Sequence, residues 1–338
     1  MLVLLSIGVV IASCGFVACQ RGQRNSALIR FLDINLAPLV DEAFVTYPVE
    51  YSLRSTEYND VIFLGDSLCH DDIDPAKLPG LRSYNLGSQG SVGSLGILLT
   101  AKAYLDHHPA PRAIILCVSP LRFEVSSNSG GGHVGRRFVA SYGPEVPGVV
   151  PLYQSLTYFT KRGALELAGQ NALVPKRGAQ ISAPVGGEIR FDAPLRGFES
   201  ETYRTLERKM QATRGFFALP GTHGTSWAVE TPAPRQLILP EWVDGMQRLA
   251  AICNHAGVPL IIHFGPIWEG VAKSRDFSIL ESWADDLEAW CPHFVTVVRP
   301  AVTAWNRDLM WDAIHLNAAG VAKFMPLVAK NVQAALKK

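Results

Sequence analysis

The sequence lacks the patterns that mark several common binding classes. Its 31 basic and 30 acidic side chains give a formal net charge of +1, so charge does not favour a nucleic-acid partner. None of the six cysteines forms a Cys-x-x-Cys pair, the usual zinc-site spacing, and no P-loop is present. Gly87, Gly90, Gly93 and Gly96 are spaced by three, which is not the dinucleotide fingerprint. We therefore expect no metal, no cofactor and no nucleic acid.

Charged residues are also scarce, at 18% of the 338 residues, whereas hydrophobic residues make up 48%. This balance is typical of a globular protein on the apolar side, and the length allows one large domain with insertions. Cys117 falls in a predicted strand and Cys253 in a predicted helix, which favours buried thiols over a disulfide framework.

The longest apolar run is residues 1–19, long enough to span a bilayer or to form the core of a secretory signal. We expect a membrane anchor first and a cleaved signal second. A lipoprotein comes third, because Ile11-Ala12-Ser13-Cys14 resembles a cleavage box but the apolar run continues past it. A buried N-terminal helix is the remaining alternative. Arg21, Arg24 and Arg30 follow the run and no basic residue precedes it, so the positive-inside rule alone would leave the main domain in the cytoplasm.

Largely apolar segments predict four strands of one parallel sheet, at residues 61–64, 113–118, 259–264 and 294–298. Residues 83–86, SYNL, are expected to form a further short strand. Helical spacing predicts helices over residues 95–105, 241–257, 277–290 and 317–336, the last with Asn317 as its N-cap. Strands that alternate with helices favour an α/β protein. We expect a three-layer α/β/α fold with a flavodoxin-like, doubly wound, five-stranded parallel sheet.

Residues 20–59 form a linker or helical segment ahead of this fold. Helical spacing covers residues 27–42, but Pro38 should kink or end that helix, and Tyr47-Pro48 should break the pattern.

Residues 126–240 are rich in glycine and proline and predict a large irregular insertion after the third strand, inside a domain that spans residues 60–338. Short helices are expected at 154–168 and 199–213. The aromatic residues of the insertion either line a binding groove or, as we favour, pack it onto the main domain.

Ser67 is a candidate nucleophile because of its place after the first strand. The strand ends at Gly65, and Asp66 and Ser67 follow at once. In open α/β sheets, ligands bind outside the carboxyl ends of the strands. A serine hydroxyl is a weak nucleophile unless a neighbouring base takes its proton. The alternative is a turn serine that caps a helix.

His315 is the candidate base, because it alone among the nine histidines has an aspartate three residues before it, Asp312. A carboxylate bound to one ring nitrogen fixes the tautomer and leaves the other nitrogen to accept a proton. Both residues follow the fifth predicted strand, so they should lie at the same sheet edge as Ser67. The sequence therefore predicts a nucleophile, a base and an orienting acid in one crevice.

Three segments together resemble the SGNH (GDSL) hydrolase superfamily. Gly65-Asp66-Ser67-Leu68 is similar to its first signature block, Asn85-Leu86-Gly87-Ser88-Gln89-Gly90 to its second and Asp312-x-x-His315 to its last. The resemblance covers residues 60–120 and 240–335.

This resemblance implies a role for each matching residue. Ser67 would be the nucleophile, His315 the base and Asp312 the residue that orients the base. The backbone amides of Ser67 and Gly90 would donate to the oxyanion.

The third block of the superfamily, Gly-x-Asn-Asp, is missing. Its asparagine side chain would give another oxyanion donor, but residues 117–123 read CVSPLRF instead. Ser119 or Arg122 could substitute, and losing one such donor typically costs on the order of 100-fold in rate. A similar departure, together with an N-terminal membrane segment, is a feature of SGNH-like proteins of envelope polymer modification, such as the alginate O-acetylation proteins and the D-alanine transfer protein of teichoic acids. Those proteins act on glycan esters, often beside a membrane-bound acyltransferase.

The residues and the resemblance together predict a membrane-anchored serine esterase or O-acyltransferase that acts on acyl esters of a cell-envelope glycan. We expect it on the periplasmic or other extracytoplasmic face of the inner membrane. The alternative is a catalytically weak glycan-binding or scaffold subunit of a polysaccharide-modifying complex, which the missing asparagine favours.

Two further groups of polar residues have simpler interpretations. Cys69-His70-Asp71-Asp72, followed by Asp74, has the content of a metal site. Consecutive ligands point in divergent directions, so a solvated loop or helix start is favoured. His263 lies in a predicted strand and is expected to be a core histidine with its hydrogen bonds satisfied.

Overall fold

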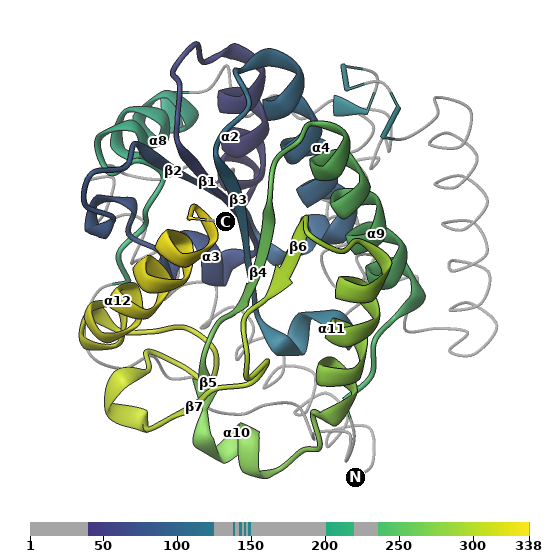
Figure 1. Cartoon of the computed structure of the whole chain (residues 1–338). Coiled ribbons are helices and arrows are strands. Elements are labelled where there is room, and N and C mark those ends of the chain that lie inside the picture. The colour runs from purple at the N-terminus through teal and green to yellow at the C-terminus, as the bar shows by residue number, and fades with distance from the viewer. Residues whose placement is uncertain are drawn as a thin grey trace, which may run out of the picture.

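The computed structural model of the chain describes residues 40–124, 201–219 and 236–337, with isolated positions between 138 and 149. Its centre is a five-stranded parallel sheet in the order β2-β1-β3-β4-β6 (Figure 1). The strands are β1 (Val61–Gly65), β2 (Ser83–Gly87), β3 (Ala113–Val118), β4 (Leu260–Phe264) and β6 (Val295–Val297). Among these strands, the chain order across the sheet is 2-1-3-4-5, which confirms the predicted flavodoxin-like, doubly wound sheet.

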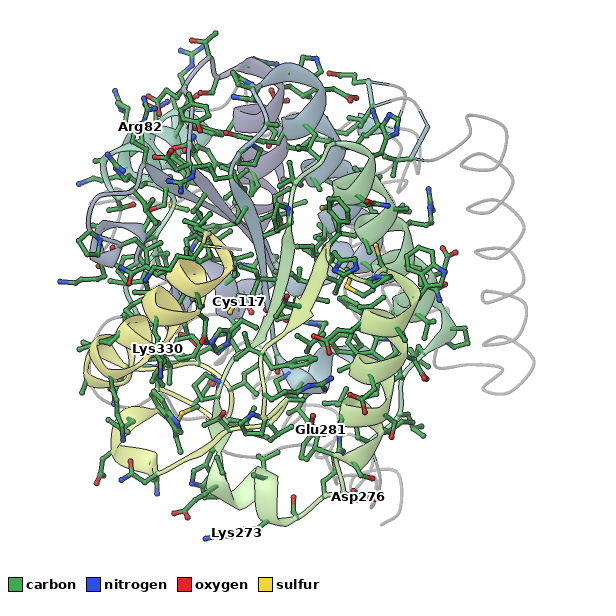
Figure 2. All side chains as sticks on the ribbon, in the orientation of Figure 1. Arg82, Cys117, Lys273, Asp276, Glu281 and Lys330 are labelled. Carbon is green, nitrogen blue, oxygen red and sulfur yellow. The ribbon has the colours of Figure 1, made fainter. Side chains whose placement is uncertain are left out.

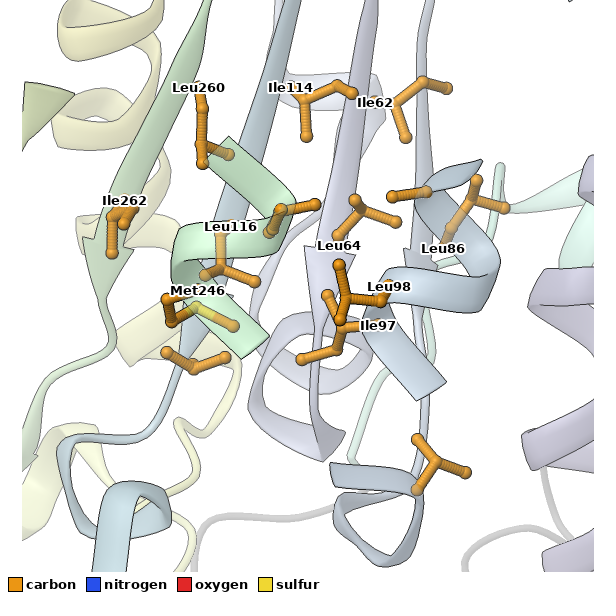
Figure 3. Close-up of a cluster of buried hydrophobic side chains, with 14 of the residues drawn as sticks. Ile62, Leu64, Leu86, Ile97, Leu98, Ile114, Leu116, Met246, Leu260 and Ile262 are labelled. Carbon is orange, nitrogen blue, oxygen red and sulfur yellow. The ribbon is translucent and has the colours of Figure 1, made fainter. Parts of the chain in front are cut away.

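Helices cover both faces of the sheet and complete the three layers (Figure 1). One face carries α2 (Val40–Arg54), α4 (Gly93–His107), α9 (Pro240–His255) and α11 (Ser278–Trp290). The other face carries α3 (Ser67–Asp72) and α12 (Ala318–Ala335). Successive strand residues point to opposite faces, so Ile62 and Leu64 join the first cluster and Phe63 the second. Figure 3 shows the first cluster, where strand residues meet Ile97, Leu98 and Met246.

Short elements complete the described part of the chain. They are α8 (Glu201–Ala212), α10 (Glu269–Lys273), the 3₁₀ turns η1 (Pro75–Lys77), η2 (Gly90–Val92), η3 (Pro120–Glu124) and η5 (Arg307–Leu309), and a two-stranded parallel sheet of β5 (Ile267–Trp268) and β7 (Ala304–Trp305). Helix α8 confirms the helix predicted at 199–213. The predicted helix at 154–168 and the predicted anchor at 1–19 lie outside the described residues.

Helix α2 corrects the prediction that Tyr47-Pro48 ends helical structure, because Pro48 lies inside it. Proline cannot donate to the carbonyl four residues back, which here belongs to Phe44. The Ser88 hydroxyl donates to the Phe44 oxygen instead, at 3.5 Å. The helix also buries Val45 and Tyr47 completely or almost completely against the first face of the sheet. Tertiary packing therefore offsets the local cost of the proline.

Cysteines and the core histidine lie as predicted. Cys117 and Cys253 are fully buried free thiols, and Figure 2 shows Cys117 in the interior of the fold. Burial raises the pKa of the Cys117 thiol. The ring of His263 is hydrogen-bonded to the Phe264 carbonyl at 3.0 Å and to the Asn331 amide at 3.3 Å.

No helix in the described ranges, which begin at residue 40, has the length and apolar character needed to cross a membrane.

Candidate active site

Ser67, His315 and Asp312 form a continuous chain of hydrogen bonds. The Ser67 Oγ lies 2.9 Å from the His315 Nε2, and the His315 Nδ1 lies 2.8 Å from the Asp312 Oδ2. Ser67 and His315 are 3% and 6% exposed, so little water competes for these contacts. Residues 248 positions apart in the sequence therefore meet at the carboxyl edge of the sheet.

Ser67 is positioned by a sharp turn from β1 into α3. Gly65 has a φ of +156°, and a Cβ there would lie 1.8 Å from the Cys117 carbonyl oxygen of the neighbouring strand, so only glycine fits. The N-cap of α3 is Asp66, whose Oδ1 accepts from the Leu68 amide at 3.1 Å. The capping role that Ser67 could have played thus falls to Asp66, and the Ser67 hydroxyl is available to the imidazole.

The loop that carries Asp312 and His315 is closed on itself. The Asp312 Oδ1 accepts from the amides of Ile314 and His315, each at 2.8 Å, and the Trp311 amide donates to the His315 carbonyl at 2.8 Å. A bridge between Met310 and Leu316 closes the turn. This geometry fixes the imidazole ring before any substrate arrives.

Two neighbouring elements hold this loop in place. Asp72 of α3 accepts from the Leu316 amide at 2.9 Å, which ties the loop to the serine helix. The Trp268 amide of β5 donates to the Ala313 carbonyl at 3.0 Å. Asn317 caps α12 by accepting from the Gly320 amide, as predicted.

Electrostatics suit Asp312 to its predicted orienting role. Burial alone would raise the pKa of Asp312, but the adjacent His315 ring and its hydrogen bonds, with those from backbone amides, outweigh burial and lower that pKa. The carboxylate is therefore ionised at neutral pH and accepts a hydrogen bond from the Nδ1–H group of His315. The other ring nitrogen, Nε2, is then free to take the Ser67 proton.

The two amides expected to donate to an oxyanion both begin helical turns. Ser67 is the first residue of α3, and Gly90 is the first residue of η2. Amides at a helix start have no acceptor inside the helix. Both are therefore available to an oxyanion at this edge of the sheet.

Arg122 lies against Gly90. A Cβ on Gly90 would lie 1.5 Å from an Nη atom of Arg122, so the guanidinium rests directly on the glycine backbone. Its Nε donates to the Asp66 Oδ2 at 3.3 Å. Asp66 therefore caps the serine helix and also orients a cationic donor beside the second predicted oxyanion amide.

Ser119, the other candidate substitute for the missing asparagine, is used differently. Its Oγ accepts from the Leu121 amide at 3.3 Å, and its own amide donates to the Asp66 Oδ2 at 3.3 Å. Ser119 is 1% exposed and stabilises the η3 turn that presents Arg122. Of the two candidates, Arg122 is the one whose side chain lies against Gly90.

The interpretation of Cys69 to Asp74 as a solvated loop or helix start is wrong in one respect. These residues do start a helix, but His70, Asp71 and Asp72 are at most 1% exposed. They are buried because α3 packs between the sheet and α12. Among the described residues, no group of three or more His, Cys, Asp or Glu side chains is arranged to hold a metal ion.

Asn85 of the second block binds the backbone of the serine helix and of its own strand. Its Nδ2 donates to the carbonyls of Cys69 and Ile73 at 2.7 and 2.8 Å, and its Oδ1 accepts from the Gly87 amide at 2.8 Å. The side chain thus joins β2 to the C-terminal end of α3. We infer a structural role for Asn85, in holding the serine helix on the sheet.

Sequence reasoning missed Asp71 and Asp72 as neighbours of the base. The Asp71 Oδ2 lies 3.6 Å from the His315 Nε2. A signal was present, because Asp71 stands four residues after Ser67 and a helix that starts at Ser67 puts both on one face.

Compared with models of protein families and with curated proteins, the chain has no match.

Proposed function

We propose that the protein is a serine esterase or O-acyltransferase that works through an acyl-enzyme on Ser67. In the first step the Ser67 Oγ attacks the acyl carbon, its proton passes to the His315 Nε2, and the carbonyl oxygen becomes an oxyanion. Collapse of this intermediate breaks the ester bond, and the proton on His315 goes to the leaving alcohol. Water or a sugar hydroxyl then accepts the acyl group by the reverse sequence.

The observation that carries this proposal is the unbroken contact from Ser67 through His315 to Asp312. A serine that merely capped a helix would need no imidazole at 2.9 Å, and that imidazole would need no ionised carboxylate behind it. Two backbone amides also hold the Asp312 carboxylate, and the Asp66 cap holds the start of the serine helix. Such preorganisation is what acyl transfer requires of its general base.

Three donors support stabilisation of the oxyanion. They are the backbone amides of Ser67 and Gly90 and the guanidinium of Arg122, which lies on Gly90. A charged donor forms a stronger hydrogen bond to an anion than a neutral amide does. Arg122 therefore takes the part that an asparagine side chain has in the superfamily pattern that the sequence resembles.

The choice of substrate rests on the resemblance and on the apolar N-terminal run. Both favour an acyl ester on a cell-envelope glycan, met at the extracytoplasmic face of the inner membrane, with a membrane-bound acyltransferase as a possible partner. The site itself requires no cofactor and no metal for this reaction. The catalytically weak glycan-binding or scaffold subunit remains the alternative, favoured by the missing third-block asparagine.

Turnover of p-nitrophenyl acetate by the purified protein tests the proposal. We expect wild-type protein to release p-nitrophenol and Ser67→Ala to lose activity by at least about 10³-fold. Asp308→Asn is a suitable control, because Asp308 is an exposed acid close to the same loop. Wild-type turnover no faster than that of Ser67→Ala would reject the enzyme and favour the binding subunit.

A further inference from the structure

A second carboxylate faces the nitrogen of His315 that contacts the serine. The His315 Nε2 lies 2.9 Å from the Ser67 Oγ and 3.6 Å from the Asp71 Oδ2. Ser67 and Asp71 come from the same face of α3, one helical turn apart. Asp312 contacts the opposite ring nitrogen. The imidazole therefore lies between two carboxylates, only one of which belongs to the predicted triad.

His70 contacts the other carboxyl oxygen of Asp71, the one that does not face His315. The His70 Nδ1 lies directly against the Asp71 Oδ1, and both residues are 1% exposed. The His70 ring is itself fixed, since it stacks on Phe44 with centroids 5.1 Å apart and meets the edge of Phe217 at 6.1 Å. The Phe217 amide donates to the His70 carbonyl at 2.8 Å. A buried and supported carboxylate of this kind has little freedom to turn away from His315.

We propose that Asp71 is a positioning residue that stabilises the protonated form of His315, in addition to Asp312. This inference rests on the proposed function, in which the proton of Ser67 moves to the His315 Nε2. That proton then points into the space shared by Ser67 and Asp71. Asp71 attracts the imidazolium without taking the proton, which passes on to the leaving alcohol.

The other ionisable groups around His315 do not duplicate this effect. Asp312 faces Nδ1 from the loop of His315 itself, and Arg122 of η3 is paired with Asp66. Asp72 is the nearest competitor, because it lies on α3 and binds the Leu316 amide. Burial raises the pKa of Asp72 well above its ordinary value, so its carboxyl is held towards the neutral form. Asp71 is thus the acid whose carboxyl oxygen lies 3.6 Å from Nε2.

The consequence is a measurable bias in the protonation of His315. A carboxylate at this distance typically moves a titration by about one pH unit or more. In Asp71→Asn, the pH at which His315 is half-protonated should fall by ~1 unit, because the amide no longer stabilises the imidazolium. The acid limb of kcat/KM should move to lower pH by the same amount, and the plateau rate should fall by up to about tenfold.

Nuclear magnetic resonance of imidazole-labelled full-length protein tests this directly, because it reads His315 with or without turnover. Asp71→Asn is the test variant, and Asp71→Ser is a second charge-free variant if the amide disturbs folding. Asp71→Glu, which keeps the charge, should restore the midpoint in part. Asp72→Asn is the matched control, since it changes the adjacent acid, which burial holds towards the neutral form, and should move the His315 midpoint less than Asp71→Asn does.

Each outcome has a definite meaning. A lower midpoint in both charge-free Asp71 variants, with a smaller shift in Asp72→Asn, supports the proposal. An unchanged midpoint in the folded Asp71 variants overturns it, and so does an equal shift in Asp72→Asn. If wild-type protein shows no turnover above Ser67→Ala, the esterase proposal fails, while the titration still reports whether Asp71 acts on His315.

Discussion

Ser67 lies between two groups of residues that are built in different ways. We call Asp312 and His315 the base side, and Gly90 and Arg122 the anion side. On one side, Asp312 and His315 follow the superfamily pattern in spacing, and their hydrogen bonds are those expected of an orienting acid and a base. On the other side, the third block has no asparagine. Arg122 there lies on Gly90 and is oriented by Asp66. The base side thus matches the pattern that the sequence resembles, whereas the proposed anion side has a cation where that pattern has a neutral donor.

This difference teaches that the two sides constrain the sequence unequally. A general base needs one ring nitrogen at hydrogen-bond distance and the correct tautomer, which few residue combinations supply. An oxyanion needs only donors that converge on one point, and backbone amides can provide most of them. The side-chain donor can therefore change chemical type as long as it reaches the same place.

The largest effect should come from breaking the base side. Asp312→Asn should lower kcat/KM by about 10³- to 10⁴-fold. Two backbone amides hold the Oδ1 position, so the asparagine would keep its oxygen there and turn its NH2 group towards Nδ1, which favours the wrong tautomer of His315. The measurement is steady-state ester hydrolysis, with Asp308→Asn as the matched control. Near-wild-type activity in Asp312→Asn would show that His315 is oriented by other contacts.

Breaking the anion side should have a smaller effect. Arg122→Ala should lower kcat by about 100-fold with little change in KM, because the lost donor acts on charge that develops in the transition state. Arg122→Lys keeps the charge but not the planar fork, and should recover only part of the loss. Arg82→Ala, which removes an exposed arginine beside Tyr58, is the control. Unchanged kcat in Arg122→Ala would show that Arg122 is not the third oxyanion donor.

The smallest expected effect is on stability. It distinguishes Asp72, which holds the loop of His315, from Asp312, which orients the His315 ring. Burial raises the pKa of Asp72 above 3.8, so the folded protein holds a proton that the unfolded chain releases. This group favours folding below its unfolded pKa and loses that contribution as pH rises towards its folded pKa. Asp72→Asn removes the titration and can still accept from the Leu316 amide.

Urea unfolding at about pH 4 and about pH 8 measures this effect. The unfolding free energy of wild-type protein should decline more between the two conditions than that of Asp72→Asn. The same pH dependence in both proteins would show that Asp72 is ionised when folded.

The sheet was predictable from the sequence because its three central strands, β1, β3 and β4, are almost continuous apolar runs. Ile62 and Phe63 serve opposite faces, and both faces are buried, so no alternation obscures the strands. The chain order and the positions of Ser67, Asp312 and His315 follow from that regular pattern. Residues in helix α2 were harder to predict, because the cost of Pro48 is offset by a hydroxyl, Ser88, that is distant in sequence.

The surroundings of the site were less predictable for the same physical reason. Asp71 was expected to be solvated because charged residues usually are, but contacts of α3 with other elements, including those of His70 and His315, bury it. The contact of Arg122 with Gly90 also depends on how two strand ends approach each other. Local patterns predict elements, whereas contacts between elements decide which polar groups share a site.

The central claim is that Ser67 is an activated nucleophile. A fluorophosphonate probe followed by peptide mass spectrometry tests it most directly, because the probe bonds to serines that a base activates. We predict a single adduct on Ser67, absent in Ser67→Ala and formed far more slowly in His315→Ala. An adduct on another residue, or no adduct on folded wild-type protein, would contradict the account.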